Sequence, residues 1–327
     1  MDNFAKEVIN NGGVLKPLLI LSKDMDFPSL TNPTILNYQD KLIVNIRNVN
    51  YSLYHSELNR YEHTWGPLVY IHPENDLKLK TVNYLCELTS DLNINSYSKI
   101  DTSKCDDPNP KWEFHGLEDV RLVVWDDTLY AIGVRRDTTD NGQGRMELSK
   151  IIIEEGRAKE VSRLRIPGPL PDEEYCMKNC TPVLDHPYRL LKWTNPTAFM
   201  DFDPDGNKDT TLFETGAYKK MPMDFRGGGQ VIPYKDGYIT IVHETYLFNS
   251  ETGKKNATYR HMFVMWDKDF KQIKFSKKFS FLNMRIEFSC GMCEYKGDYI
   301  VTFGACDNTA YILKIPGTYL EQFLSGG

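Results

Sequence analysis

The segment from residue 115 to residue 121 places four ionisable side chains close together. It contains the imidazole of His115, the adjacent carboxylates of Glu118 and Asp119, and the guanidinium of Arg121. Carboxyl and imidazole groups are common proton donors and acceptors in general acid–base catalysis. Because successive side chains of a strand point to opposite faces, we expect one carboxylate to face a ligand while the other pairs with Arg121 or a backbone group. The alternative interpretation is a turn with a satisfied ion pair.

A second segment has the composition of an anion site. Arg226 is followed by three consecutive glycines, Gly227–Gly229, and His243 and Glu244 stand at the far end of the next hairpin. Arginine offers a fork of donors to phosphate, and glycines let a backbone approach a ligand closely. No Gly-Lys-Ser/Thr follows the glycines, so this is not a P-loop. The alternative interpretation is a glycine-rich β-bulge with an incidental arginine.

Weaker clusters of polar residues occur at the same place relative to other apolar strands. Their members that could bind a ligand are Asn32, Arg47, Asn50, Tyr51, Lys178 and Asp307. Taken singly, each cluster is typical of a solvated turn. Because loops at one end of a closed β fold carry its binding residues, the recurrence predicts that these side chains converge on one ligand site.

Five repeats of a turn followed by an apolar strand must position these side chains. The repeats are Gln39–Ile46, Asp126–Ile132, Asp185–Leu191, Lys235–Val242 and Lys296–Phe303. Asp-Gly and Gly-Asp between apolar runs favour hairpin turns, because they supply the positive φ that these turns require. Repeats about 65 residues apart, with almost no helical periodicity, predict an all-β fold, a five-bladed β-propeller. A two-sheet sandwich is the alternative, because the spacing is irregular.

We expect residues 1–327 to form a single propeller domain. The polar stretch around 91–110 is interpreted as a long loop insertion and not as a linker. Helices are expected only as short pieces, at Asn3–Asn10 and around Thr318–Leu324.

The composition excludes several classes of protein. With 39 Lys and Arg against 45 Asp and Glu, the chain lacks the basic excess of a general nucleic-acid binder. The longest apolar run, Leu18–Leu21, is too short to span a membrane, and no signal peptide is visible. We therefore expect a cytoplasmic protein without membrane contact. A homo-oligomer is compatible with the sequence.

Known cofactor and metal motifs are missing. The sequence contains no G-x-S-x-G, H-E-x-x-H or G-x-G-x-x-G, so serine hydrolase, zincin and dinucleotide-binding functions lose their support. The seven cysteines are an odd number and include a single C-x-x-C at Cys290–Cys293, which fits reduced, buried thiols better than disulfides or zinc. We expect neither a cofactor nor a metal.

Around Gly116–Arg121 the chain resembles glycoside hydrolase family 130, the five-bladed propeller mannoside phosphorylases and related enzymes, whose signature is G-x-E-D-P-R. The match extends to Lys178-Asn179, to Arg226-Gly227-Gly228 with His243, and to Phe303–Asp307, in the family's order. Val120 replaces the proline of the signature, and Cys180 stands where many members have an aromatic residue.

The resemblance implies inverting phosphorolysis of a β-mannoside, with an oligosaccharide or glycoside and inorganic phosphate as substrates. Asp119 would be the general acid, and phosphate would attack C1 from the opposite face to release α-mannose 1-phosphate. Lys178, Arg226 and His243 match phosphate-binding positions. A second phosphate-binding arginine is open among Arg135, Arg136, Arg163 and Arg165. The expected substrate-binding residues are Asn32, Arg47, Asn50, Tyr51, His115, Glu118 and Asp307.

Three alternatives remain beside phosphorolysis. Related propellers act as mannosyltransferases that use a nucleotide sugar. Others hydrolyse β-mannosides with a carboxylate general base, for which Glu244 or Glu287 could serve here. The third alternative is a sugar-binding propeller without catalytic activity.

Overall fold

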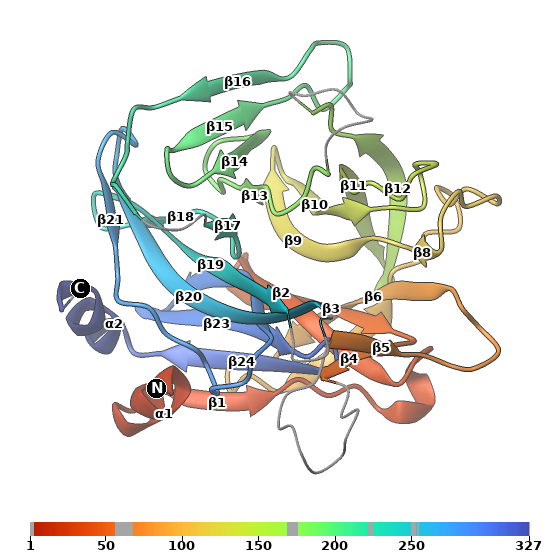
Figure 1. The fold of residues 1–327 in the computed structure, drawn as a ribbon, viewed down its shortest axis with the longest axis horizontal. Coiled ribbons are helices and arrows are strands. Elements are labelled where there is room, and N and C mark those ends of the chain that lie inside the picture. The colour runs from red at the N-terminus through yellow and green to blue at the C-terminus, as the bar shows by residue number, and fades with distance from the viewer. Residues whose placement is uncertain are drawn as a thin grey trace.

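Five antiparallel sheets are arranged radially around a central axis (Figure 1). This computed structural model describes residues 3–55, 68–168, 176–221, 225–249, 253 and 255–326. The predicted five-bladed β-propeller is therefore confirmed, and the sandwich is excluded.

The sheets follow one another along the chain. Blade 1 contains β2 (Ser29–Tyr38), β3 (Lys41–Val49), β6 (Leu79–Leu88), β7 (Ile94–Lys99) and β8 (Phe114–His115). Blade 2 contains β9 (Glu118–Trp125), β10 (Thr128–Arg135), β11 (Arg145–Glu154) and β12 (Arg157–Arg165). Blade 3 contains β13 (Thr181–Pro182), β14 (Arg189–Trp193), β15 (Ala198–Asp201) and β16 (Thr211–Glu214).

The last two sheets complete the ring. Blade 4 contains β17 (Arg226–Gly227), β18 (Ile232–Tyr234), β19 (Gly237–Asn249), β20 (Lys255–Asp267) and β21 (Ile273–Phe275). Blade 5 contains β22 (Glu287–Tyr295), β23 (Asp298–Ala305), β24 (Thr309–Ile315) and β1 (Val14–Pro17). Because β1 pairs with β24, the N-terminal strand belongs to the last blade and closes the ring. Closure by the chain's own ends covers the edge of β24 with a strand from the other end of the chain.

The five turns that the sequence predicts occupy the same place in every blade. Each joins the strand nearest the axis to the next strand outward, as in β2–β3, β9–β10 and β22–β23. The backbone at these turns adopts positive φ at Asp40, Asp127 and Gly297. A left-handed pair of turn residues matches the twist of the flanking strands, which is why Asp and Gly recur there.

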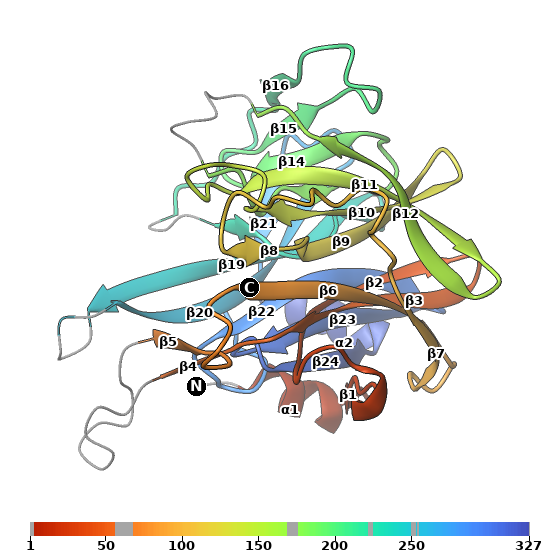
Figure 2. The ribbon, with the colours of Figure 1, turned by 90° about the vertical axis from the view of Figure 1, so that its right-hand side faces the viewer.

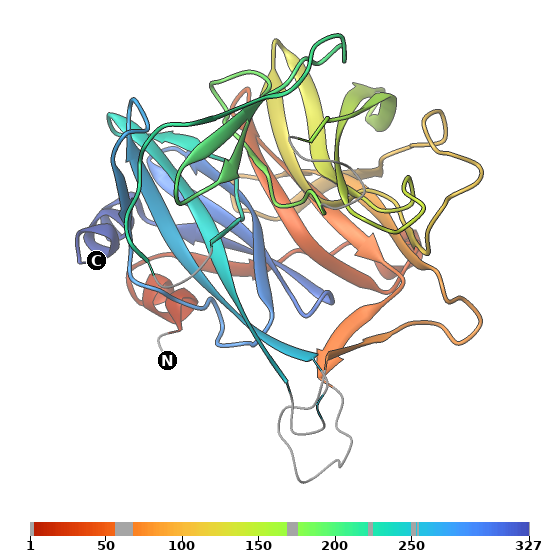
Figure 3. The same ribbon diagram turned by 45° about the horizontal axis from the view of Figure 1, so that its top comes forward.

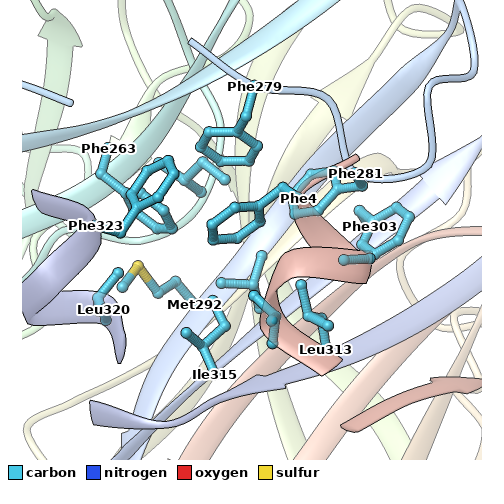
Figure 4. Packing of buried hydrophobic residues seen from close by; sticks show 14 of the residues in the cluster. Phe4, Phe263, Phe279, Phe281, Met292, Phe303, Leu313, Ile315, Leu320 and Phe323 are labelled. Atoms are coloured by element: carbon cyan, nitrogen blue, oxygen red, sulfur yellow. The ribbon is translucent and has the colours of Figure 1, made fainter. Parts of the chain in front are cut away.

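A cluster of aromatic rings packs both helices against blades 4 and 5 (Figure 4). Helix α1 (Phe4–Asn10) begins where the Asn3 side chain accepts a hydrogen bond from the amide of Lys6. It buries Phe4 among rings of blade 4, and α2 (Gly317–Ser325) contributes Phe323 from the other end of the chain. Both expected helices are confirmed, together with a short 3-10 turn η1 (Ser22–Asp24).

Gln230 ties four blades together at the axis. Its fully buried amide nitrogen donates to Thr34 Oγ1 at 3.1 Å and to the carbonyl oxygens of Ile35 and Leu122 at 2.9 Å each. Its carbonyl oxygen accepts from the amide of Met292 at 2.9 Å. Because a buried amide that satisfies its donors and acceptors rigidifies its surroundings, this residue fixes the blades on which the site is built.

Two parts of blade 1 differ from the expectation. The stretch around 91–110 contains β7, so only the part after Ile100 forms an extended loop. An unexpected ribbon of β4 (Ser52–His55) and β5 (Leu68–Ile71) projects from the blade. Figures 2 and 3 show this ribbon beside the long strands β19 and β20, which extend past the body of the propeller. None of the helices in the described part of the chain is long and apolar enough to cross a bilayer.

Candidate active site

A cavity of about 220 Å³ lies at one end of the central axis. Strands from different blades bring together residues that are far apart in the sequence. Nine of the residues singled out from the sequence line it: Asn32, Arg47, Tyr51, Glu118, Asp119, Lys178, Arg226, His243 and Asp307.

Asp119 is held in place by two donors from blade 1. Its Oδ1 accepts hydrogen bonds from Asn32 Nδ2 at 2.8 Å and from Arg47 Nη1 at 2.9 Å. Burial raises the pKa of Asp119, but the charges of Arg47 and Arg121 outweigh it and leave the pKa below its usual value. Without a ligand, this carboxyl group is therefore ionised at neutral pH.

Glu118 and Asp119 both line the cavity, although adjacent strand residues ordinarily face opposite ways. The pairing of β9 with β10 shifts between Arg121 and Glu118, so that β9 bulges there, and Asp119 adopts a φ of +49°. A bulge re-aims a side chain, which explains why the expected division of the two carboxylates is wrong. Burial raises the pKa of Glu118, so the two neighbours differ in how easily they release a proton.

Arg47 lies among the acidic residues of the cavity. Its guanidinium is almost fully buried, donates to Asp119 and to the hydroxyl of Tyr51, and lies 3.7 Å from Glu118 Oε2. Asp307 is the third acidic residue, and its Oδ1 accepts a hydrogen bond from Asn32 Nδ2 at 3.3 Å. Burial, and then the nearby charge of Asp119, raise the pKa of Asp307. We call Glu118, Asp119 and Asp307 the acidic pole.

Gly304 allows this arrangement. A Cβ atom at Gly304 would lie 2.3 Å from Asn32 Oδ1. Any side chain at this position would therefore displace the amide that holds both Asp119 and Asp307.

The cavity has basic residues besides Arg47. Lys178 and Arg226 line it together with Arg136, and we call these three residues the basic pole. Within the described residues, none of the three forms an ion pair with a carboxylate. Arg136 donates to the carbonyl of Gly142 and stacks over Phe114, which holds its guanidinium at the cavity wall.

His243 stands beside the basic pole as a neutral imidazole. It pairs in register with Arg226 across β17 and β19, is 2% exposed, and stacks on the ring of Tyr259. Burial, followed by the nearby His261 and Arg226, lowers the pKa of His243 well below its usual value. Its Nδ1 is buried without a hydrogen-bond partner among the residues that the structure describes.

Arg121 connects the backbone of Asp119 to the glycine segment that follows Arg226. It donates to the carbonyl oxygens of Asp119 at 2.6 Å, of Gly228 at 2.9 Å and of Gly227 at 3.4 Å. The side chain is fully buried. The expected pairing of Arg121 with a carboxylate is therefore replaced by bonds to main-chain carbonyls, which connect the backbone of the acid to the glycine segment beside Arg226.

The glycines after Arg226 serve chiefly to bring strands together. A Cβ atom at Gly227 would lie 2.1 Å from the carbonyl oxygen of Asn179. The sequence predicts that these glycines let the backbone approach a ligand. In the structure they instead let blade 4 approach the segment that carries Lys178.

Of the four arginines left open, only Arg136 lines the cavity in the part of the chain described. Arg135 pairs with Asp137 at 3.0 Å, and Arg163 pairs with Glu160 and Asp106. Arg165 donates to the carbonyl of Thr138. Arg135 is the last residue of β10 and Arg136 is the first residue after it, so the end of the strand decides which of the two neighbours reaches the cavity.

Two residues expected to bind substrate lie elsewhere. Asn50 is buried, and its side-chain amide bonds to the backbone of Lys78 and Lys80 at 2.8 and 2.6 Å. His115 lines a separate cavity between blades 1 and 2. Neither residue lines the central cavity, so both expectations are wrong for this structure.

Both candidate general bases also point away from the cavity. Glu244 forms an ion pair with Lys278 at 2.7 Å. Glu287 is fully buried and accepts hydrogen bonds from the amides of Phe281, Leu282 and Met284 at 2.6 to 2.8 Å. These contacts give Glu287 a structural role in a turn, and neither glutamate lines the cavity.

Aromatic residues that the sequence did not single out complete the walls. Tyr70, Phe114, Tyr259 and Phe288 line the cavity. Only the overall aromatic content suggested such rings, because the β4–β5 ribbon that carries Tyr70 has no turn signal of the kind that marked the blades. No group of three or more His, Cys, Asp and Glu residues suited to a metal ion occurs in the described ranges.

Comparison with known proteins supports the fold. No family model and no curated protein matches the sequence. Among solved structures, a β-1,2-mannobiose phosphorylase from Listeria innocua is 9% identical, with a TM-score of 0.55 over 96% of this chain and 97% of that one. A mannose phosphorylase from Leishmania mexicana, solved with a phosphate ion, is 12% identical, with a TM-score of 0.51 over 97% and 93%. A glycosyl hydrolase from Bacteroides ovatus is 11% identical, with a TM-score of 0.56 over 93% and 91%. At such identities the likeness shows the propeller fold alone.

Proposed function

We propose that this protein is a carbohydrate-active enzyme that cleaves a β-mannoside by inverting phosphorolysis, with release of α-mannose 1-phosphate. The observation that carries the proposal is that one cavity holds a candidate acid together with basic residues that have no described ion-pair partner. Arg47 pairs with Asp119 of the acidic pole, whereas no described carboxylate forms an ion pair with the three residues of the basic pole. Inverting phosphorolysis needs an acid and a bound phosphate on opposite faces of the reacting sugar.

The basic pole suits a phosphate ion. Arg136 and Arg226 offer planar forks of donors, and Lys178 adds a point charge. His243 is neutral because of burial, so it contributes a hydrogen bond and no further charge. The mannose phosphorylase of similar fold was solved with a phosphate ion, which agrees with this assignment.

Phosphate binding would also prepare Asp119 to act as the acid. The charge of Lys178 contributes to the low pKa of Asp119 in the empty site. A phosphate anion beside Lys178 compensates that charge and adds a like charge, so the pKa of Asp119 rises. Protonation of the acid is thereby coupled to arrival of the nucleophile.

In the reaction, a phosphate oxygen forms a bond to C1 while the bond from C1 to the glycosidic oxygen breaks. The proton of Asp119 passes to the departing oxygen, directly or through a sugar hydroxyl, and Asp119 is left ionised beside Arg47. Arg47, Asn32 and Asp307 surround the acid and would bind hydroxyl groups of the reacting sugar. Solvent then returns the proton to Asp119 for the next turnover.

Hydrolysis has less support from the geometry. The described carboxylates that line the cavity are Glu118, Asp119 and Asp307, the three members of the acidic pole. Because Glu244 and Glu287 are engaged in contacts elsewhere, neither candidate base is available to activate water.

The test is incubation of the protein with β-mannobioses of each linkage, with and without inorganic phosphate, followed by assay of mannose 1-phosphate and free mannose. We expect mannose 1-phosphate only when phosphate is present. Release of free mannose at a rate independent of phosphate would contradict phosphorolysis and support hydrolysis. Thermal stabilisation by GDP-mannose, and not by phosphate, would instead indicate a mannosyltransferase.

A further inference from the structure

Glu118 and Asp119 are adjacent carboxylates of the central cavity, and they differ in their hydrogen bonds. Asp119 Oδ1 accepts from Asn32 Nδ2 at 2.8 Å and from Arg47 Nη1 at 2.9 Å. The carboxyl group of Glu118 accepts no hydrogen bond from a described residue, and its ion pair with Arg47 Nη2 is 3.7 Å long. Because donors favour the ionised form of a carboxyl group, the negative charge of this pair belongs first to Asp119.

The surroundings of Glu118 disfavour a second charge. Its side chain is only 13% exposed, and two further carboxylates, Asp119 and Asp307, line the same cavity. Burial raises the pKa of Glu118, and the charges of Asp119 and Asp307 add to this effect. The charges of Arg47 and Arg136 oppose it without cancelling it. Carboxyl groups this close to one another share protons, so they titrate as a coupled set.

Binding of the proposed phosphate would strengthen this effect. The anion would compensate the charge of Arg136 and the other two residues of the basic pole. Arg47 then remains as the described cation in contact with the carboxyl groups of Glu118 and Asp119. Tyr51 and Tyr70 also line the cavity, and burial raises the pKa of both hydroxyl groups, so they stay neutral. The acidic pole therefore keeps a proton.

Position distinguishes Glu118 from Asp307 as the holder of that proton. Asp307 Oδ1 accepts a hydrogen bond from Asn32, which favours its ionised form. The bulge in β9 brings Glu118 into the cavity beside Asp119, and the two carboxyl groups contact the two terminal nitrogens of one guanidinium, that of Arg47. A proton on Glu118 is therefore held next to the carboxylate that must deliver it.

We propose that Glu118 holds the proton that Asp119 delivers to the departing glycosidic oxygen. The proposal rests on the proposed function, because it supplies the acid of that reaction. Glu118 acts through Asp119 and does not touch the departing oxygen.

The proton moves in two steps. When phosphate and glycoside bind, the O–H bond of Glu118 breaks and an O–H bond forms on Asp119, through a sugar hydroxyl or a water molecule that gives up one proton as it receives another. Asp119 then protonates the departing oxygen, and both carboxyl groups are left ionised. The proton that solvent returns for the next turnover reaches Asp119 by way of Glu118.

The pH dependence of phosphorolysis tests this role. Glu118 keeps a proton on the pair at a pH at which Asp119 alone is already ionised, so its removal matters most in alkaline solution. We expect the loss of kcat/KM in Glu118→Gln, relative to the wild type, to grow at least tenfold from pH 5 to pH 8. Phosphate titrates equally in both assays, so the difference belongs to the protein. A loss that is equal at every pH would overturn the proposal and leave Glu118 a sugar-binding or structural residue.

Two further variants sharpen the assignment. Glu118→Asp keeps a carboxyl group and should restore the pH dependence of the wild type. The matched control is Asp307→Asn, which removes another carboxylate of the acidic pole. Its loss of kcat/KM should vary by less than threefold over the same pH range. A variation as large as that of Glu118→Gln would assign the stored proton to Asp307 and overturn the proposal.

Nuclear magnetic resonance separates a failure of this proposal from a failure of the proposed function, because it needs no turnover. The wild-type protein is labelled with 13C at the glutamate carboxyl groups, and the Glu118 signal is identified by its loss in Glu118→Asp. We expect this signal to titrate above the ordinary glutamate value of about 4.3. That result without cleavage of any mannoside would support the protonated Glu118 and contradict the proposed function. Phosphorolysis together with titration at or below the ordinary value would overturn the stored proton alone.

Discussion

The central cavity and the cavity between blades 1 and 2 are similar in size and differ in how their charges are arranged. The side cavity, of about 250 Å³, is lined by Asp106, Asp137 and Glu160 together with Arg135 and Arg163. These charges neutralise one another, as in the contacts of Arg135 with Asp137 and of Arg163 with Asp106 at 3.0 Å each. In the central cavity, Arg47 pairs with Asp119 at 2.9 Å, but Arg136, Lys178 and Arg226 form no ion pair with a described carboxylate.

The comparison teaches that charges in ion pairs stabilise a wall, whereas charges without an ion-pair partner are available to bind a ligand. A buried ion pair needs both partners, and neither is available to a substrate. Charged groups without an ion-pair partner keep unfilled hydrogen-bonding capacity, which a ligand can satisfy. Five predictions test this distinction, beginning with the largest expected effect.

Replacement of Asp119 by Asn should abolish the proposed acid while preserving the shape of the acidic pole. Loss of a positioned general acid typically costs roughly 10²–10⁴-fold in rate. We expect kcat to fall by that amount, with sugar affinity from calorimetry within a few-fold of the wild type. Unchanged turnover would remove Asp119 from the mechanism.

Acid should destabilise the protein through the histidines behind the basic pole. His261 is fully buried, neither ring nitrogen has a hydrogen-bond partner among the described residues, and burial lowers its pKa to about 3. The unfolded state therefore binds a proton near pH 6.5 that the folded state takes up only near pH 3. Stability is complete above pH 6.5 and falls with pH through this window, by on the order of 5 kcal/mol at most for His261.

His261→Phe tests the contribution of His261 to this loss of stability, because the variant keeps an aromatic ring between Phe279 and Phe281. We expect urea denaturation at pH 7.5 and 4.5 to show a smaller loss of stability in the variant than in the wild type. An identical loss would assign the acid sensitivity to other groups.

In the side cavity, Arg163→Gln should affect stability and not activity. The change leaves the carboxylates of Glu160 and Glu147, both almost fully buried, without one of their partners. Removal of one partner from a buried pair destabilises by about 3 kcal/mol, measurable as a lower urea midpoint. The kcat/KM of the folded variant should stay within twofold of the wild type, and a large loss would connect the two cavities.

In the central cavity, Arg226→Gln should affect anion binding and not stability. Because Arg226 is exposed and forms no ion pair with the described carboxylates, folding loses little. Loss of a hydrogen bond to a charged group, about 1.5–3 kcal/mol, predicts a rise in KM for phosphate of roughly 10–100-fold. A lower melting temperature with unchanged KM would reverse the assignment of the two cavities.

The smallest effect is expected for His115→Ala. His115 lines the side cavity and a second pocket with Trp112, and it does not line the central cavity, although the sequence places it three residues before Glu118. We expect kcat/KM to change by less than twofold. A tenfold loss would return His115 to the substrate site.

The sequence alone determined the propeller and much of the candidate site. The turns that mark each blade depend on the positive φ of residues such as Asp127 and Gly297, which is a local property that residue types reveal. The resemblance that covers most of the chain supplied Asp119, Lys178, Arg226 and His243, and the structure places all four around one cavity.

Only the tertiary structure decided which neighbours share a face. A bulge turns Glu118 toward the cavity beside Asp119. Arg136, which follows the end of β10, lines the cavity, whereas Arg135 within the strand does not. Asn50 and Glu287 have suitable chemistry, but their side chains form hydrogen bonds with the backbone of other segments. A motif states which groups are present. The register and the bulges of the five sheets decide whether a group meets a ligand or another part of the chain, because register and bulges depend on contacts between residues far apart in the sequence.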